Sequence, residues 1–93
     1  MRAKKVDYNQ LEITATLRKI GATVQSLATV GNGCPDLLVG FQGINYLMEV
    51  KDGDKVPSAQ KLTPDQVKWH IEWCGEVHIV RSVEDAFGVL GLP

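Results

Sequence analysis

The strongest constraint on this chain is a pair of short apolar segments, residues 36–41 and 44–51, joined by Gln42-Gly43. In the second segment the apolar residues Ile44, Tyr46, Met48 and Val50 alternate with Asn45, Leu47, Glu49 and Lys51. A strand sends alternate side chains to opposite faces, so Glu49 and Lys51 share one face. Charged groups in such an apolar setting are costly to bury unless they pair or bind something. The segment therefore predicts both a hairpin and a functional site.

A two-residue turn at Gln42-Gly43 would set the register of this hairpin. It places Phe41 opposite Ile44 and, at the far end, Asp36 opposite Glu49. Opposed residues have Cβ atoms about 4.5–5.5 Å apart, so these carboxylates repel unless a proton or a cation lies between them. A hard divalent cation with oxygen ligands meets this need. Gln-Gly is a weaker hairpin signal than Asn-Gly, and a longer loop or a bulge at Gly40 stays open.

The length of 93 residues predicts one small domain spanning 1–93, and the 44% of apolar residues suffices for a thin core. A second copy of the chain is a candidate to complete that core or the function. No apolar run approaches the roughly 20 residues that span a membrane, and no signal peptide follows the basic start. We expect a cytoplasmic protein in which Cys34 and Cys74 are reduced, buried thiols. The net charge of −1 does not by itself indicate nucleic-acid binding.

The first half of the chain supplies a basic arm, a helix and a strand around the hairpin. Residues 1–6 are either a solvated terminus or an arm that contacts phosphates. Residues 7–20 predict a helix that Asp7 caps and Gly21 ends. Its expected apolar stripe is formed by Leu11 and Ala15, extended by Tyr8, Leu17 and Ile20. A strand is expected at 22–30, and residues 52–62 predict a loop, either a connector or a segment that orders over substrate.

The second half predicts helix, strand and helix. Thr63, Pro64 and Gln66 carry the signals of a helix start with a capping box, and Gly75 ends that helix. The expected core stripe of the helix is Val67, Ile71 and Cys74, with Gln66, Trp69, His70 and Trp73 on an adjoining face. The Trp pair favours core or subunit packing over base stacking. A strand at 76–81 and a helix capped by Ser82 follow, the latter with a stripe of Val83, Ala86, Phe87 and Leu90.

The pattern Pro35-Asp36, then Glu49-Val50-Lys51, resembles the PD-(D/E)xK nuclease signature. Together with GNGCPDLLVG and LTPDQVKWHIEW, it is similar to the VRR-NUC family, especially its small stand-alone members in phages and bacteria. The resemblance covers roughly residues 10–80. It implies an α/β, restriction-endonuclease-like core in the order α-β-β-β-α-β-α, with a central mixed sheet flanked by helices. It also implies a structure-selective, metal-dependent DNA endonuclease similar to Holliday-junction resolvases that act as homodimers.

The resemblance also assigns roles to individual residues. It implies that Asp36, Glu49, Lys51 and Gln66 are catalytic. Mg²⁺ or Mn²⁺ would be held by Glu12 on the first helix, by Asp36 and Glu49, and by the backbone carbonyl of Val50. The late strand carries one arginine, Arg81, where relatives can show two, and this leaves its role open.

Other functions remain open at this point. One is a branched-DNA-binding module that is inactive or depends on a partner protein, and another is a flap or nick nuclease that works as a monomer. A zinc module would use the two cysteines with His70 and His78, but the spacing lacks a Cys-x₂-Cys pair.

Overall fold

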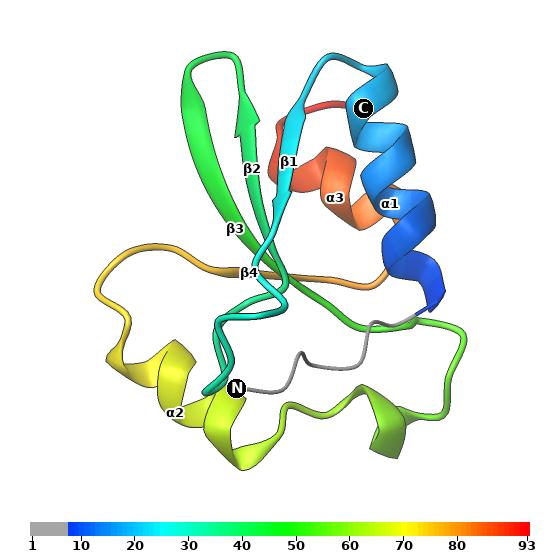
Figure 1. Ribbon diagram of the computed structural model, residues 1–93. Helices are drawn as coiled ribbons and strands as arrows, with labels where there is room; N and C mark the ends of the chain where they lie inside the picture. Colours follow the sequence, from blue (N-terminus) through cyan, green and yellow to red (C-terminus); the bar gives the residue numbers. More distant parts are fainter. Residues whose placement is uncertain (1–7) are drawn as a thin grey trace.

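The fold is built on a four-stranded mixed sheet in the order β1-β2-β3-β4, described by a computed structural model for residues 8–93 (Figure 1). The elements in chain order are α1 (Tyr8–Lys19), β1 (Thr23–Ser26), β2 (Leu37–Phe41), β3 (Ile44–Val50), η1 (Pro57–Gln60), α2 (Pro64–Glu72), β4 (His78–Val80) and α3 (Val83–Val89). The expected order and the mixed sheet flanked by helices are confirmed. The predicted basic arm and the cap at Asp7 lie outside the described residues.

The hairpin has the predicted register. Phe41 pairs with Ile44 and Leu37 with Met48 in the antiparallel β2–β3 ladder. Gln42 and Gly43 both have positive φ, 50° and 82°, as a two-residue type I′ turn requires. β1 is antiparallel to β2, whereas β4 is parallel to β3 and is reached by a crossover through η1 and α2. One step beyond the Leu37–Met48 pair, the same register places Asp36 beside Glu49.

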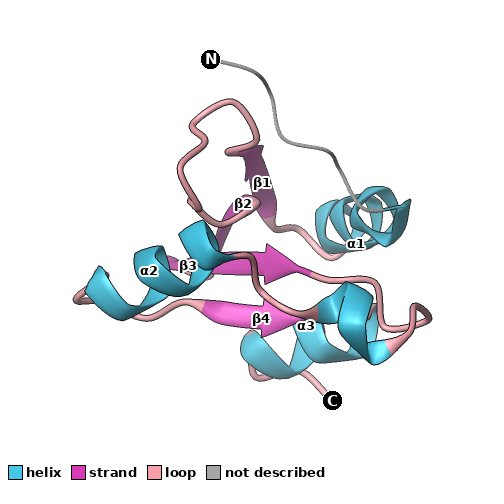
Figure 2. Ribbon diagram, turned by 90° about the horizontal axis from the view of Figure 1, so that it is seen from below, coloured by secondary structure: helices cyan, strands magenta, loops and turns pink. Residues whose placement is uncertain are grey.

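The two faces of the sheet have different roles. The core face carries buried apolar side chains from β2, β3 and β4, which pack with α1 and α3; the set is Ile13, Leu17, Ala22, Leu37, Val39, Met48, Val50, Val80, Ala86 and Leu90. Strand alternation puts Glu49 and Lys51 on the opposite face. In Figures 1 and 2, α1 and α3 lie together on one side of the sheet and α2 lies on the other. The polar face is thus the one that α2 partly covers.

The predicted apolar stripe of α1 is wrong except at Leu17, which is buried. Leu11 is 69% exposed, whereas the buried side chains of α1 are Gln10, Ile13 and Leu17. The rotation of the helix is fixed at its start, because Asn9 Nδ2 donates to the carbonyl oxygens of Lys51 and Arg81 at 3.0 and 3.1 Å. The end at Gly21 is as predicted: its φ is 96°, and the amides of residues 21 and 22 close the helix onto carbonyls of its last turn.

The predicted stripe of α2 is also wrong. Val67 is exposed, Ile71 is 78% exposed, and Cys74 lies beyond the helix and is exposed rather than buried. The face that turns toward the sheet carries Gln66, which is buried, and Trp69, which is half-buried. Trp69 and Trp73 stack with ring centroids 4.6 Å apart. Together with Leu38 and Leu47 of the sheet they line a largely apolar cavity of about 640 Å³, so the tryptophans pack beside the sheet.

Three other boundaries differ from expectation. The strand at 22–30 ends at Ser26, because the chain turns as Leu27 N donates to Asp36 O at 2.8 Å. The segment 52–62 contains the short helix η1, and β4 is only three residues long. Ser82 caps α3 as predicted, with Asp85 N donating to its Oγ at 3.0 Å. No helix in residues 8–93 is long and apolar enough to cross a membrane.

Candidate active site

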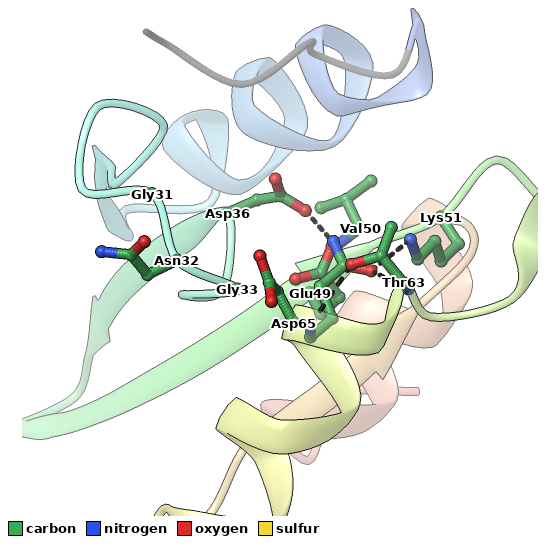
Figure 3. A pocket seen from close by; sticks show the side chains of 10 residues that line it. Gly31, Asn32, Gly33, Asp36, Glu49, Val50, Lys51, Thr63 and Asp65 are labelled. Carbon is green, nitrogen blue, oxygen red and sulfur yellow. Dashed lines mark hydrogen bonds between the residues drawn. The ribbon is translucent and has the colours of Figure 1, made fainter. Parts of the chain in front are cut away.

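Five of the six predicted site residues meet at one cavity of about 360 Å³. Asp36, Glu49, Lys51 and Gln66 line it, together with Gly31, Asn32, Gly33, Val50, Thr63 and Asp65 (Figure 3). The four side chains are almost fully withdrawn from solvent: Glu49 is 1%, Asp36 4%, Gln66 6% and Lys51 7% exposed. Three acidic or basic groups at this depth need specific partners, and the structure provides them.

Asp36 is fixed where the loop 31–35 enters β2. Its Oδ2 accepts a hydrogen bond from the backbone amide of Val50 at 2.7 Å, and its backbone oxygen accepts from Leu27 N. The side-chain bond crosses from β2 to β3, so the carboxylate is tied to the strand that carries Glu49 and Lys51 (Figure 3). A charge-assisted bond of this length holds the acid in one orientation at the cavity wall.

Gln66 connects the acid and the lysine of β3. Its Nε2 donates to Glu49 Oε2 at 3.2 Å, and its Oε1 accepts from Lys51 Nζ at 2.8 Å. The same Oε1 accepts from Thr63 N at 2.9 Å, while Gln66 N donates to Thr63 Oγ1 at 3.2 Å, which completes the predicted capping box. The amide nitrogen of Gln66 faces an acceptor and the amide oxygen faces two donors, so the orientation of the amide is determined. The start of α2 and the charged pair are therefore one hydrogen-bonded unit.

Gly33 sets the distance between the loop and α2. Its φ is 83°, and a Cβ added there would lie 2.9 Å from Gln66 N and closer still to the Asp65 carbonyl. A Gly-Asn-Gly loop such as residues 31–33 lets the backbone approach a ligand or turn sharply. The structure shows that the backbone approaches the first turn of α2 instead. No local sequence signal could reveal this contact, because the two segments are distant in the chain.

Glu12 is the predicted site residue that the structure does not bring to the others. It is exposed on α1 and does not line the cavity, because the rotation fixed by Asn9 turns Gln10 inward in its place. Gln10 is 4% exposed, and its Oε1 has no hydrogen-bond partner among the described residues. Since Asn9 bonds to Lys51 O, this turn of α1 lies near the end of β3. In the sequence, Gln10 follows Asp7 at the spacing of a capping box, and this local signal does not reveal that the Gln10 side chain is buried.

The donor set suits a hard divalent cation better than zinc. Within residues 8–93 no three His, Cys, Asp or Glu side chains come together as ligands for one ion, so the two cysteines, His70 and His78 do not form a zinc cage. The cavity offers the carboxylates of Asp36 and Glu49, and Val50 also lines it. Two carboxylates and a carbonyl leave several positions for water and phosphate oxygens, which is how Mg²⁺ is commonly bound. The residues present thus fit Mg²⁺ or Mn²⁺.

Comparison with known proteins gives one informative match. No protein-family model matches the sequence, and no curated protein matches it significantly. A solved structure described as a VRR_NUC domain is similar with a TM-score of 0.64 and 26% sequence identity, over 88% of this chain and 89% of that chain. The similarity covers nearly the whole of both chains, and the acidic, lysine and glutamine residues of the signature gather at one cavity. The chain therefore has the fold of a VRR_NUC domain, and its site residues resemble those of that family of nucleases.

Proposed function

We propose that this protein is a Mg²⁺- or Mn²⁺-dependent endonuclease that cuts branched DNA, with the four-way junction as its preferred substrate and a homodimer as its active form. The similarity to a VRR_NUC domain supports phosphodiester hydrolysis in general. The observation that carries the proposal is the linked set of Glu49, Gln66 and Lys51 beside Asp36 in one open cavity. In such a set, Asp36 and Glu49 can bind a metal ion, and the oriented ammonium of Lys51 can stabilise negative charge that develops during the reaction.

In this reaction water attacks phosphorus, the bond from phosphorus to one ester oxygen breaks, and negative charge grows on the phosphoryl oxygens. A divalent cation held by Asp36, Glu49 and the Val50 carbonyl would supply Lewis-acid chemistry and a water of lowered proton affinity. Lys51 Nζ, directed by Gln66 Oε1, stabilises the developing charge or positions the attacking water. Gln66 holds both Lys51 and Glu49, so it keeps the acid and the cation in fixed relation as charge moves.

The exposed apolar side chains of α2 support the homodimer. On α2, Val67 and Ile71 lie one helical turn apart and are 42% and 78% exposed in a single copy of the chain, and Trp73, just after the helix, is 46% exposed. Exposed apolar side chains that gather in one patch commonly mark interaction sites. Junction resolution needs two coordinated cuts, and a two-fold symmetric dimer places one active site on each strand. A second copy of this chain is therefore the proposed occupant of the α2 surface. A flap or nick nuclease would use the same cavity as a monomer, and a partner-dependent binding module would not cut alone.

The test compares cleavage of matched four-way junction, flap, nicked and linear duplex DNAs with Mg²⁺, with Mn²⁺ and with EDTA, while the mass of the protein is measured in solution. We expect a dimer that cuts the junction fastest and loses activity in EDTA. A Lys51→Ala variant should stay folded and bind DNA but cut poorly. Equal cutting of linear duplex by a monomer would remove the resolvase proposal, and an active Lys51→Ala variant would remove the assignment of the lysine.

Two broader proposals accompany this one. The residues 1–93 act as a single nuclease domain of the small stand-alone type found in bacteria and phages. Its place of action is then the cytoplasm of a bacterium or of a phage-infected cell, where branched DNA arises.

A further inference from the structure

A second, basic pocket adjoins the catalytic cavity. It has a volume of about 300 Å³ and is lined by Pro57, Gln60, Lys61, Leu62 and Arg81. Its lining contains two cationic side chains and no acid. Leu62 precedes Thr63, which lines the catalytic cavity, so the two hollows are neighbours along this segment. We propose that Arg81 and Lys61 bind one backbone phosphate of the DNA next to the phosphate that is cut. This inference rests on the proposed nuclease function.

The backbone of Arg81 lies beside that of Lys51. β3 and β4 are parallel with Val50 paired to Val80, and Lys51 N donates to Val80 O at 2.9 Å. Lys51 and Arg81 directly follow this pair, so their backbones lie side by side, about 4.8 Å apart in the direction across the sheet. Asn9 Nδ2 donates to both of their carbonyl oxygens, which holds the two backbones together. A phosphate held by Arg81 would thus lie close to one that Lys51 contacts.

The guanidinium of Arg81 is already oriented. Its Nε donates to Gln60 Oε1 at 3.0 Å, and Gln60 Nε2 donates to the carbonyl oxygens of Lys55 and Gly53 at 2.6 and 3.3 Å. Asp85, an acid near Arg81, accepts from the backbone amide of Arg81. Within the described residues the two Nη groups make no hydrogen bond, so they stay available to a planar anion. A pre-oriented fork of this kind suits a phosphate group.

The charge of the catalytic cavity explains why such a contact is needed. Asp36, Glu49 and Asp65 all line that cavity, and the whole chain has a formal charge of −1. Neither the cavity nor the molecule as a whole therefore attracts a polyanion before a metal binds. Cations placed at the edge of the cavity would hold the DNA backbone while the acids remain accessible to the metal. Lys61 and Arg81 occupy that position.

The test measures DNA binding without a divalent cation, so that it is independent of cleavage. A fluorescein-labelled four-way junction is titrated by anisotropy over a series of NaCl concentrations with Arg81→Gln, Lys61→Gln, the double variant and wild type. For Arg81→Gln we expect about tenfold weaker binding and a salt slope smaller by about one. Because both side chains hold one phosphate, the double variant should lose no more slope than Arg81→Gln. Arg81→Lys, which keeps the charge, should keep the slope.

Lys19→Gln is the matched control, because it removes one positive charge from an exposed position at the end of α1. The inference is overturned if Arg81→Gln has the same salt slope as wild type. It is also overturned if Lys19→Gln loses as much slope as Arg81→Gln, or if the double variant loses twice as much slope as Arg81→Gln. Melting curves check that each variant folds, and the backbone hydrogen bonds of Arg81 do not depend on its side chain. If wild type cuts DNA but the slopes are unchanged, the phosphate site fails alone. If wild type binds through Arg81 but never cuts, the nuclease proposal fails and the phosphate site stands.

Discussion

Replacing Gly33 by alanine should separate backbone strain from displacement of α2. Gly33 and Gly43 both have positive φ, 83° and 82°. A Cβ at Gly43 meets nothing within 4 Å, whereas a Cβ at Gly33 collides with the peptide between Asp65 and Gln66. The two substitutions therefore share the strain of a left-handed alanine, and only Gly33→Ala moves the helix. Gly43→Ala is the matched control.

The free-energy cost of left-handed strain, which both alanine variants share, is small. An L-residue in the left-handed region costs about 1–2 kcal/mol, and the reduced entropy of the unfolded chain returns about 0.4–1 kcal/mol. The net loss of about 1 kcal/mol corresponds to a melting temperature lower by roughly 4–8 °C for a domain of this size. Gly33→Ala adds the collision, and because backbone atoms cannot rotate away, the start of α2 has to move by on the order of 1 Å. A displacement of that size at a positioning residue can lower a rate about 100-fold.

The assay is single-turnover cleavage of a labelled four-way junction with saturating Mg²⁺, well below both melting temperatures. We expect Gly43→Ala to cut like wild type and Gly33→Ala to be slower by about two orders of magnitude, with similar DNA affinity. If the two variants cut at equal rates, the packing of Gly33 against α2 does not position Gln66, and the account of the network is refuted.

Two further variants test the buried polar network. Lys51→Met keeps the length of the side chain and removes a cation that is 7% exposed. Burying an ion costs several kcal/mol, and the hydrogen bond of Lys51 to Gln66 returns only about 1.5–3 kcal/mol. We therefore expect Lys51→Met to have an unchanged or higher melting temperature and cleavage lowered about 100- to 1,000-fold. The control Lys19→Met should change neither quantity, and an active Lys51→Met would contradict the proposed role of the lysine. Gln66→Ala removes the hydrogen bonds to Lys51, Thr63 and Glu49, so calorimetry should show a loss of about 2–4 kcal/mol and cleavage should fall as well, whereas full stability would argue against the network.

The hairpin and its site could be predicted because local rules and chemistry agree there. Alternation in β3 puts Glu49 and Lys51 on one face, and the turn at Gln42-Gly43 fixes the register that brings Asp36 to them. Neither step requires knowledge of distant packing. The family resemblance then supplied Gln66, which neither alternation nor register could have placed. These residues meet as expected.

The rotations of α1 and α2 could not be predicted because both helices carry apolar residues around much of their circumference. In α1, the stripe with Leu11 and the stripe with Ile13 are equally plausible from spacing. The choice is made by Asn9, whose side chain reaches carbonyl oxygens 42 and 72 residues away. That choice also decides which polar residue is buried: Gln10 lies inward, whereas Glu12, which the family resemblance implied for the metal site, is exposed. A single long-range polar contact thus reversed an assignment based on apolar periodicity.

The capping box of α2 shows why a local signal can conceal a functional one. Thr63 and Gln66 satisfy each other's backbone amides, and sequence rules would count the glutamine as a capping residue. A side-chain amide has two donors and two acceptor positions, however, and the cap uses only one acceptor. Lys51 takes a second position on the same oxygen, and Glu49 takes a donor. The hydrogen bond that caps α2 and the hydrogen bonds that order the site therefore all use the Gln66 side chain. Because these bonds keep Gln66 facing the sheet, Val67 and Ile71 remain exposed. It follows that α2 cannot rotate to bury those residues without breaking both its own cap and the site.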